Sequence, residues 1–172
     1  QKTNFVSLQN GYHGETLGAL SVTDVALFKD TYAPLLRQSH QLPSPDWRLA
    51  EPGESAEAYA LRCADHAEAF LSECADSTAA VILEPLVQGA AGMAMYHPAY
   101  LARLRALCDE YGVHLIADEI AVGFGRTGSL FACQQAGIKP DFLCLSKGIT
   151  GGYLPLSCVL TTDAVYAAFY DD

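Results

Sequence analysis

The stretch "AAVILEPLVQGAAGMAMYHPAYLARLRALCDEYGVHLIADEI", residues 79–120, decides the fold class of this chain. Its two ends, 79–86 and 113–120, are apolar at successive positions, as is typical of strands covered on both faces of a parallel sheet. Between them Pro98, a favoured first helical residue, opens a helical pattern with an expected buried face of Leu101, Leu104, Leu107, Cys108 and Tyr111. Strand, helix, strand in this order predicts a right-handed crossover in an open α/β sheet with flanking helices.

The same alternation continues on both sides of this stretch. Further strands are predicted at 4–9, 141–146 and 156–162, and a second long helix within 54–75. In that helix one apolar stripe is expected to comprise Tyr59, Cys63, Ala67, Phe70 and Cys74. The segment 29–55 is rich in Pro, Ser and charge and predicts a long surface excursion. The 172 residues therefore fit one α/β domain.

Composition argues against several classes of partner. Hydrophobic residues make up 51% of the chain, but no apolar run approaches the roughly 20 residues that cross a bilayer, so we expect no membrane partner. The net charge is −10 and the ten Lys and Arg residues are scattered, so nucleic acid is not an expected partner. The start shows neither an initiator Met nor a secretory signal pattern, and we expect a piece of a longer, cytoplasmic protein.

The sequence gives no metal-ligand pattern. Its six cysteines include no CxxC pair, and its five histidines have no ligand spacing. We therefore expect buried free thiols in a reducing compartment and no metal site.

Polar residues gather where the predicted strands end. In open α/β sheets a ligand sits beyond the carboxyl ends of the strands. These ends deliver Glu84, then Asp118 and Glu119, then Lys147. Two acidic strand ends and one lysine are thus predicted to meet at one edge of the sheet.

Three chemistries use such a set. An Asp-Glu strand end can hold magnesium in nucleotide hydrolases, but the chain contains no GxxxxGK[ST] phosphate loop. Gly123, Gly125 and Gly128 spell the dinucleotide-binding pattern GxGxxG, but they begin three positions past the strand end and follow two carboxylates that would crowd a pyrophosphate.

The third chemistry is a Schiff base. The partly desolvated amine of Lys147 can condense with a carbonyl such as the aldehyde of pyridoxal 5'-phosphate. A carboxylate that keeps the pyridine nitrogen protonated makes the ring an electron sink, which suits Asp118. Tyr12, directly after the first strand, could stack on the ring. Taken singly, these residues could equally be a solvated lysine, a helix cap and a turn.

The order of four motifs along the chain favours the Schiff-base chemistry over these separate explanations. "NGYHGET" (10–16), "ILEPLVQGAAGM" (82–93), "LIADEIAVGFGRTG" (115–128) and "LSKGITGGYLPLS" (145–157) resemble the class III aminotransferases, pyridoxal-phosphate enzymes with the aspartate aminotransferase type of fold. The resemblance implies that Lys147 is the Schiff-base lysine and proton shuttle and Asp118 the partner of the pyridinium nitrogen. It implies that Tyr12 lies over the ring and touches substrate, with Ile120 on the other ring face.

Three more residues match the motifs in supporting positions. Glu84 is interpreted as a residue behind the site. Arg126 could hold a carboxylate or form a structural ion pair. His13 could orient Tyr12.

Departures within the class favour one substrate pair. Ala90 and Ala121 stand where the ornithine and 4-aminobutyrate enzymes carry Glu and Gln, so a glutamate donor is less expected. The motifs instead resemble those members that move an amino group from S-adenosylmethionine to 8-amino-7-oxononanoate, although Val122 and Glu15 depart from that pattern. The alternatives are another class III transaminase acting on a terminal amine, and an inactive structural fragment without cofactor.

The resemblance also implies missing parts. Family members carry an upstream Gly-Ser segment for the cofactor phosphate, a downstream Thr from the partner subunit and a C-terminal domain with a substrate arginine. Residues 1–172 are therefore expected to be the central part of the cofactor-binding large domain of a homodimer, with the N-terminal and C-terminal parts absent.

Overall fold

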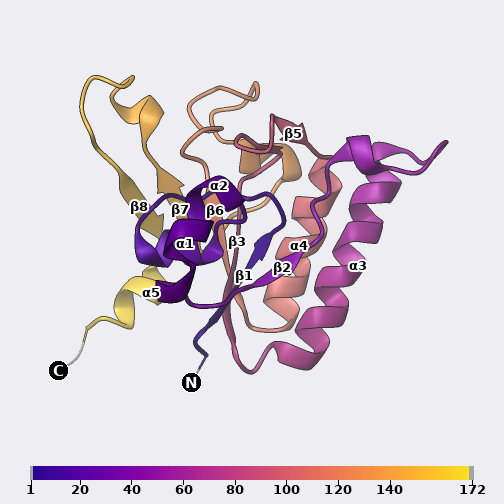
Figure 1. The fold of residues 1–172 in the computed structure, drawn as a ribbon, viewed down its shortest axis with the longest axis horizontal. Coiled ribbons are helices and arrows are strands. Elements are labelled where there is room, and N and C mark those ends of the chain that lie inside the picture. The colour runs from indigo at the N-terminus through magenta and orange to yellow at the C-terminus, as the bar shows by residue number, and fades with distance from the viewer. Residues whose placement is uncertain (1, 171–172) are drawn as a thin grey trace.

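The computed structural model describes residues 2–170 and is built on a six-stranded sheet of order β2-β1-β3-β6-β7-β8 (Figure 1). The strands span Asn4–Leu8 (β1), His40–Leu42 (β2), Thr78–Leu83 (β3), His114–Asp118 (β6), Phe142–Leu145 (β7) and Cys158–Thr161 (β8). All neighbours pair in parallel except β8, which is antiparallel to β7. The predicted, mainly parallel α/β sheet is confirmed, with strands shorter than expected.

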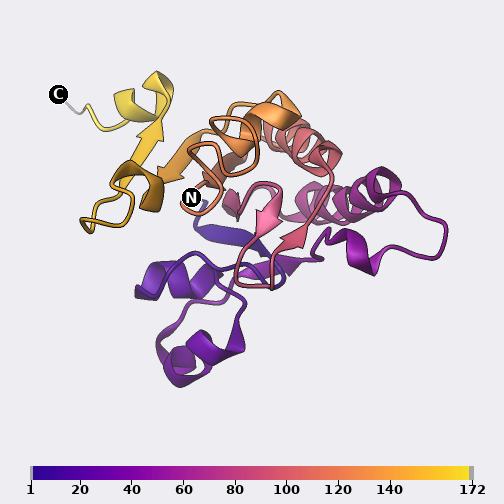
Figure 2. The same ribbon diagram turned by 90° about the horizontal axis from the view of Figure 1, so that it is seen from above.

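Two long helices, α3 (Ala56–Cys74) and α4 (Pro98–Glu110), cover one face of this sheet, while α1 (Leu17–Val22) and α2 (Ala26–Lys29) lie on the other side (Figure 2). The Ser55 hydroxyl caps α3 by accepting from the amide of Ala58 at 3.1 Å. The largest fully buried apolar side chains come from the sheet and from these helices; they include Leu8, Leu83, Leu115, Leu71, Tyr100, Leu101, Leu104 and Leu107.

The buried stripe of α3 differs from the expected one. Phe70 and Cys74 are only partly buried, whereas Ala60, Ala64 and Leu71 are buried with the predicted Tyr59, Cys63 and Ala67. The alanines on this face are small, so α3 can pack closely against α4. In α4 the predicted face is buried except for Tyr111, which lies half-buried at the C-cap.

The segment 29–55 is not only a surface excursion. Its strand β2 pairs with β1 and places Leu42 in the core, while η1 (Asp30–Leu35) and η2 (Trp47–Leu49) lie on either side of it. The three-residue strand was hidden in the sequence because its apolar pattern is too short to have a period.

The remaining elements are short. A hairpin of β4 (Val87–Gln88) and β5 (Ala94–Met95) follows β3, η3 (Ala132–Ala136) precedes β7, η4 (Lys147–Ile149) follows it, and α5 (Asp163–Ala167) follows β8. Nearly every residue from 151 to 170 is exposed.

All six cysteines are free thiols, of which Cys63, Cys108 and Cys133 are buried and Cys158 is exposed. Within residues 2–170 no group of three or more His, Cys, Asp or Glu side chains is placed to hold a metal ion. No helix of the described chain has the length and apolar character to cross a membrane.

Candidate active site

The parallel strands β1, β3, β6 and β7 end at the same edge of the sheet, and the loops that follow them enclose a cavity of about 550 Å³. Six of the seven predicted site residues line it: Tyr12, His13, Glu84, Asp118, Ile120 and Lys147. These residues line one cavity although Tyr12 and Lys147 are 135 positions apart in the chain, because the strands that precede them end at the same edge of the sheet.

Asp118 ends β6 and is 6% exposed. Its Oδ2 lies 2.9 Å from Nδ1 of His13, and its Oδ1 accepts from the amide of Ile120 at 3.2 Å. A carboxylate only accepts, so the N–H at Nδ1 of His13 donates a hydrogen bond to Asp118. The ring of His13 thus contacts Asp118, and the expected effect of His13 on the orientation of Tyr12 stays a prediction.

Tyr12 follows β1 and forms a wall of the cavity. Its ring packs on Phe28 with centroids 5.3 Å apart, and its hydroxyl donates to Oε1 of Glu15 at 3.0 Å. Burial raises the pKa of the Tyr12 hydroxyl, and the Glu15 carboxylate raises it further. The phenol therefore stays neutral near neutral pH.

Glu84 lines the cavity and joins two of its loops. The amides of Tyr12 and Gly89 donate to its two carboxylate oxygens at 3.0 and 2.8 Å. Burial raises the pKa of this carboxyl, while the two amides act in the opposite direction. Gln88, which the sequence did not single out, adds a second link by donating to the carbonyl of Gln9 at 2.8 Å.

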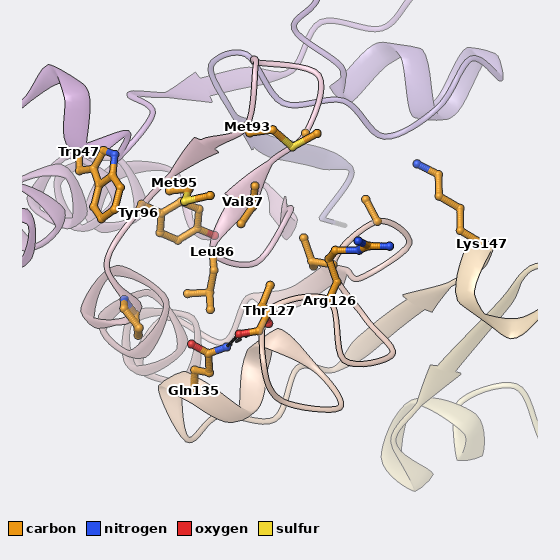
Figure 3. A pocket seen from close by; sticks show the side chains of 14 residues that line it. Trp47, Leu86, Val87, Met93, Met95, Tyr96, Arg126, Thr127, Gln135 and Lys147 are labelled. Carbon is orange, nitrogen blue, oxygen red and sulfur yellow. Dashed lines mark hydrogen bonds between the residues drawn. The ribbon is translucent and has the colours of Figure 1, made fainter. Parts of the chain in front are cut away.

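Lys147 sits in η4, immediately after β7. Its backbone has φ of 22°, in the left-handed region that residues other than glycine rarely adopt. Within residues 2–170 its amine makes no hydrogen bond or ion pair, and it lines both the 550 Å³ cavity and a neighbouring one of about 580 Å³. Figure 3 shows this second cavity, with Lys147 extending toward it from the loop after β7.

Arg126 lines only the second cavity, together with Met93 of the β4–β5 turn and the exposed Trp47 (Figure 3). Its side chain is exposed and forms no ion pair with any residue that the structure describes. The structural ion pair considered for Arg126 is therefore not seen in this part of the chain.

Glu119 is a further buried residue that sequence reasoning left without a role. It is 0% exposed, and its carboxylate accepts from the amides of Ala132 and Cys133 at 2.7 and 2.8 Å. The Asp-Glu doublet in the sequence could have indicated this role, because adjacent residues of an extended chain face opposite ways. The Asp118 carboxylate enters the cavity, and the Glu119 carboxylate anchors the end of the loop 120–131.

Comparison with known proteins defines the class. The model of the class-III aminotransferase family matches residues 1–171, and the chain belongs to this family of pyridoxal-phosphate-dependent transaminases. The adenosylmethionine-8-amino-7-oxononanoate aminotransferases of Helicobacter pylori and Geobacter sulfurreducens are 51% and 44% identical over 99% and 98% of this chain. The chain spans 37% and 38% of the lengths of these two relatives.

Solved structures agree with this fold. The crystal structure of adenosylmethionine-8-amino-7-oxononanoate aminotransferase from Methanocaldococcus jannaschii matches with a TM-score of 0.86 and 38% identity, over 99% of this chain and 37% of that one. The omega transaminase of Pseudomonas jessenii in complex with PMP matches with a TM-score of 0.88 and 35% identity, over 96% and 37%.

The donor set of the 550 Å³ cavity fits pyridoxal 5'-phosphate, the cofactor of this family. The cavity offers a primary amine on Lys147, a fixed carboxylate on Asp118, an aromatic ring on Tyr12 and an apolar side chain on Ile120. These are an amine for the aldehyde, an acceptor for the proton on the ring nitrogen, and two surfaces for the ring.

Proposed function

We propose that this chain supplies the reactive part of an aminotransferase site that moves an amino group from S-adenosylmethionine to 8-amino-7-oxononanoate, giving 7,8-diaminononanoate for biotin biosynthesis. The observation that carries the proposal is the single cavity lined by Lys147, Asp118, Tyr12 and Ile120. The substrate pair is supported by the names of eight relatives, which are 39% to 51% identical to this chain.

Each residue has one task in this proposal. When bound, the cofactor supplies an electron sink for the carbon that carries the amino group. Asp118, held by His13 and the Ile120 amide, keeps a proton on the ring nitrogen. Lys147 would hold the cofactor through Nζ, and its free amine would move the proton of the amine substrate.

Tyr12 and Ile120 hold the ring plane between them, and Glu84 keeps the Tyr12 loop against the loop that begins at Gly89. The ring is thereby aligned before the reaction begins, so positioning is not repeated at each turnover.

We also propose that the chain is the central part of a cofactor-binding large domain in a homodimer. The support is its coverage of 31% to 39% of the lengths of the relatives. In addition, Lys147 is the only lysine or arginine that lines the 550 Å³ cavity in the described chain, so groups outside it are needed for the cofactor phosphate.

A second candidate function is transfer from another terminal amine. The observation that motivates it is the match to the omega transaminase of Pseudomonas jessenii, with a TM-score of 0.88 and 35% identity, beside 0.86 and 38% for the Methanocaldococcus jannaschii enzyme. Comparing S-adenosylmethionine with simple terminal amines as donors decides between the two candidates. A third possibility, that the 172-residue chain by itself is an inactive fragment without cofactor, is tested by the visible absorbance of the isolated chain and not by that of the intact protein.

The proposed role of Lys147 is tested by borohydride reduction of the intact, cofactor-loaded protein followed by peptide mapping. The pyridoxyl group is expected on Lys147, because the other lysines of the chain, Lys2, Lys29 and Lys139, lie away from the cavity. Lys147→Ala is the matched control and should lose this label. Label on another lysine in the wild-type protein would overturn the assignment.

A further inference from the structure

The loop after β6 touches the backbone next to Lys147 at one point. A Cβ atom added to Gly148 would lie 2.7 Å from Cγ and 2.8 Å from Cβ of Phe124. Such separations are too short for carbon atoms, so the Phe124 side chain occupies the space where position 148 would otherwise carry a side chain. Glycine at 148 is what allows the two loops to approach this closely.

Both loops hold an unusual backbone conformation at this contact. Phe124 has φ of 58° and Lys147 has φ of 22°, and neither residue is a glycine. Conformations of this kind are strained and persist only where the surroundings fix them. The two strained residues belong to different loops and meet through Gly148.

The loop that carries Phe124 is held in place by hydrogen bonds to Glu119 and by ring packing. Glu119 accepts from the Gly123 amide through its carbonyl at 2.8 Å, while its buried carboxylate accepts from the amides of Ala132 and Cys133. The Phe124 ring also meets the ring of Phe131 at 5.9 Å, edge to face.

The Lys147 side is held by bonds on either side of the lysine. Its short turn is closed by the Ile149 amide donating to the Ser146 carbonyl at 2.9 Å, and the hydroxyls of Ser146 and Thr150 donate to the carbonyls of Leu156 and Leu154 at 2.7 and 2.8 Å. The lysine side chain itself has no hydrogen-bond partner within residues 2–170, so the packing of Phe124 on Gly148 is the contact from the loop after β6 that acts directly beside the lysine backbone.

We propose that Phe124 is the positioning residue for Lys147: its ring, packed against Gly148, keeps the lysine backbone in the left-handed conformation that directs the amine into the cavity. This inference rests on the proposed function, which gives Lys147 its reactive role. Phe124 does not line either cavity that Lys147 lines, so it acts through the lysine and not on substrate.

The test uses the intact enzyme with Phe124→Ala, Gly148→Ala and the control Leu61→Ala. Leu61 is 42% exposed and Phe124 40%, but Leu61 lies on α3 and lines neither cavity of the site. Two quantities are measured: kcat and KM with the amine donor, and amide hydrogen exchange of residues 146–150 in the cofactor-free enzyme. The second measurement is independent of turnover.

Phe124→Ala is expected to lower kcat by about ten- to a hundredfold with little change in KM, because a small displacement of a reacting group has an effect of this size. Exchange at 146–150 should become faster, while Leu61→Ala leaves both readouts unchanged. Gly148→Ala changes the contact from the other side and should also lower kcat, so a folding defect in one variant does not end the test.

Unchanged kcat and exchange in Phe124→Ala would overturn the positioning role, as would a loss of thermal stability with the wild-type kcat and KM. If borohydride label in the wild-type enzyme falls on a lysine other than Lys147, the proposed function fails, and this outcome is distinct from a failure of the Phe124 inference alone.

Discussion

Asp118 is the residue whose surroundings are most closely defined. Its carboxylate is nearly buried and has two donors, the His13 ring and the Ile120 amide, but no arginine or lysine among its hydrogen-bond partners in the described chain. A buried carboxylate without an arginine or lysine partner keeps its ability to attract a further proton-bearing group. This is the electrostatic property that a ring-nitrogen partner requires.

Replacing Asp118 with Asn should lower kcat/KM by on the order of a hundredfold or more, which is the usual effect of removing an aligned electrostatic group. The amide keeps the size of the side chain, so thermal stability should change little. Steady-state kinetics and thermal unfolding of the two proteins check this. A variant within about threefold of wild type, well under 1 kcal/mol in transition-state stabilisation, would assign Asp118 to strand-end capping only.

His13 should act through Asp118. Its side chain is 2% exposed, and the only hydrogen bond of its ring in the described chain is the one to this carboxylate. We therefore expect His13→Phe to lower kcat/KM in the wild-type background and to have a clearly smaller effect in the Asp118→Asn background, because residues in one network are not additive. Equal effects in both backgrounds would show that His13 has a separate task.

At the scale of elements, Asp141 fastens α4 and β6 to the start of β7. Its Oδ2 accepts from the Leu115 amide at 2.7 Å and from Nη1 of Arg105 at 2.8 Å. Burial raises the pKa of the Asp141 carboxyl, but the bonds from Leu115 and Arg105 outweigh this, and the net pKa is lower than usual. The imidazole of His114, with Nδ1 3.8 Å from Oδ2, also faces this carboxylate.

The lowered pKa sets the pH dependence of this contribution. The pKa of the Asp141 carboxyl is lower in the folded state than its unfolded value, close to 3.8. The carboxylate therefore stabilises the folded state fully above the unfolded pKa, and this stabilisation is lost as the pH falls through the folded pKa. Asp141→Asn should therefore lower the free energy of unfolding by about 1.5–3 kcal/mol at pH 6. The difference from wild type should shrink below about pH 4. Urea unfolding of both proteins at several pH values checks this, and a difference that grows in acid would contradict it.

The sequence predicted the long elements but not the short ones. The strands β1, β3, β6, β7 and β8 were predicted from apolar runs of sufficient length, and the helices α3 and α4 from apolar residues that recur with the helical period. The three-residue β2 and the six-residue α1 were not, since they form through contacts made by the rest of the fold.

The candidate site shows the same division. The strand-end rule placed Asp118 and Lys147 together, because parallel strands end at one edge. The hydrogen bond of His13 to Asp118 was not predicted, and Gln88 and Phe124 were missed. Their contacts depend on how separate loops approach each other, and no local pattern records that approach.

At the scale of the whole molecule, two surfaces are left open. Large apolar side chains after η4 are exposed, with Tyr153 at 92% and Phe169 at 82%. On the sheet face opposite α3 and α4, Phe5, Ile82 and Ile116 line a hollow of about 590 Å³ with α1. Apolar surface of this extent indicates that other protein covers it.

The 172-residue chain alone is therefore expected to bind pyridoxal 5'-phosphate weakly and to show no turnover. Lys147 is exposed, and the 550 Å³ cavity contains no second cation from the described residues for the phosphate. Dialysis of the isolated chain after incubation with the cofactor, followed by absorbance and transaminase assays, checks this. A stable yellow colour with measurable turnover would contradict it, and the intact enzyme is the control.

The three buried cysteines allow the opening of the core to be measured by alkylation, without introducing new residues. Burial raises the pKa of the Cys108 thiol to about 12 and also raises that of Cys63, so both react slowly with alkylating reagents while the fold is closed. Cys63 lies on α3 and Cys108 on α4, whereas the exposed Cys158 reacts from the start and calibrates the reagent. Alkylation rates compared residue by residue would thus show which helix separates first from the sheet, and at what free energy.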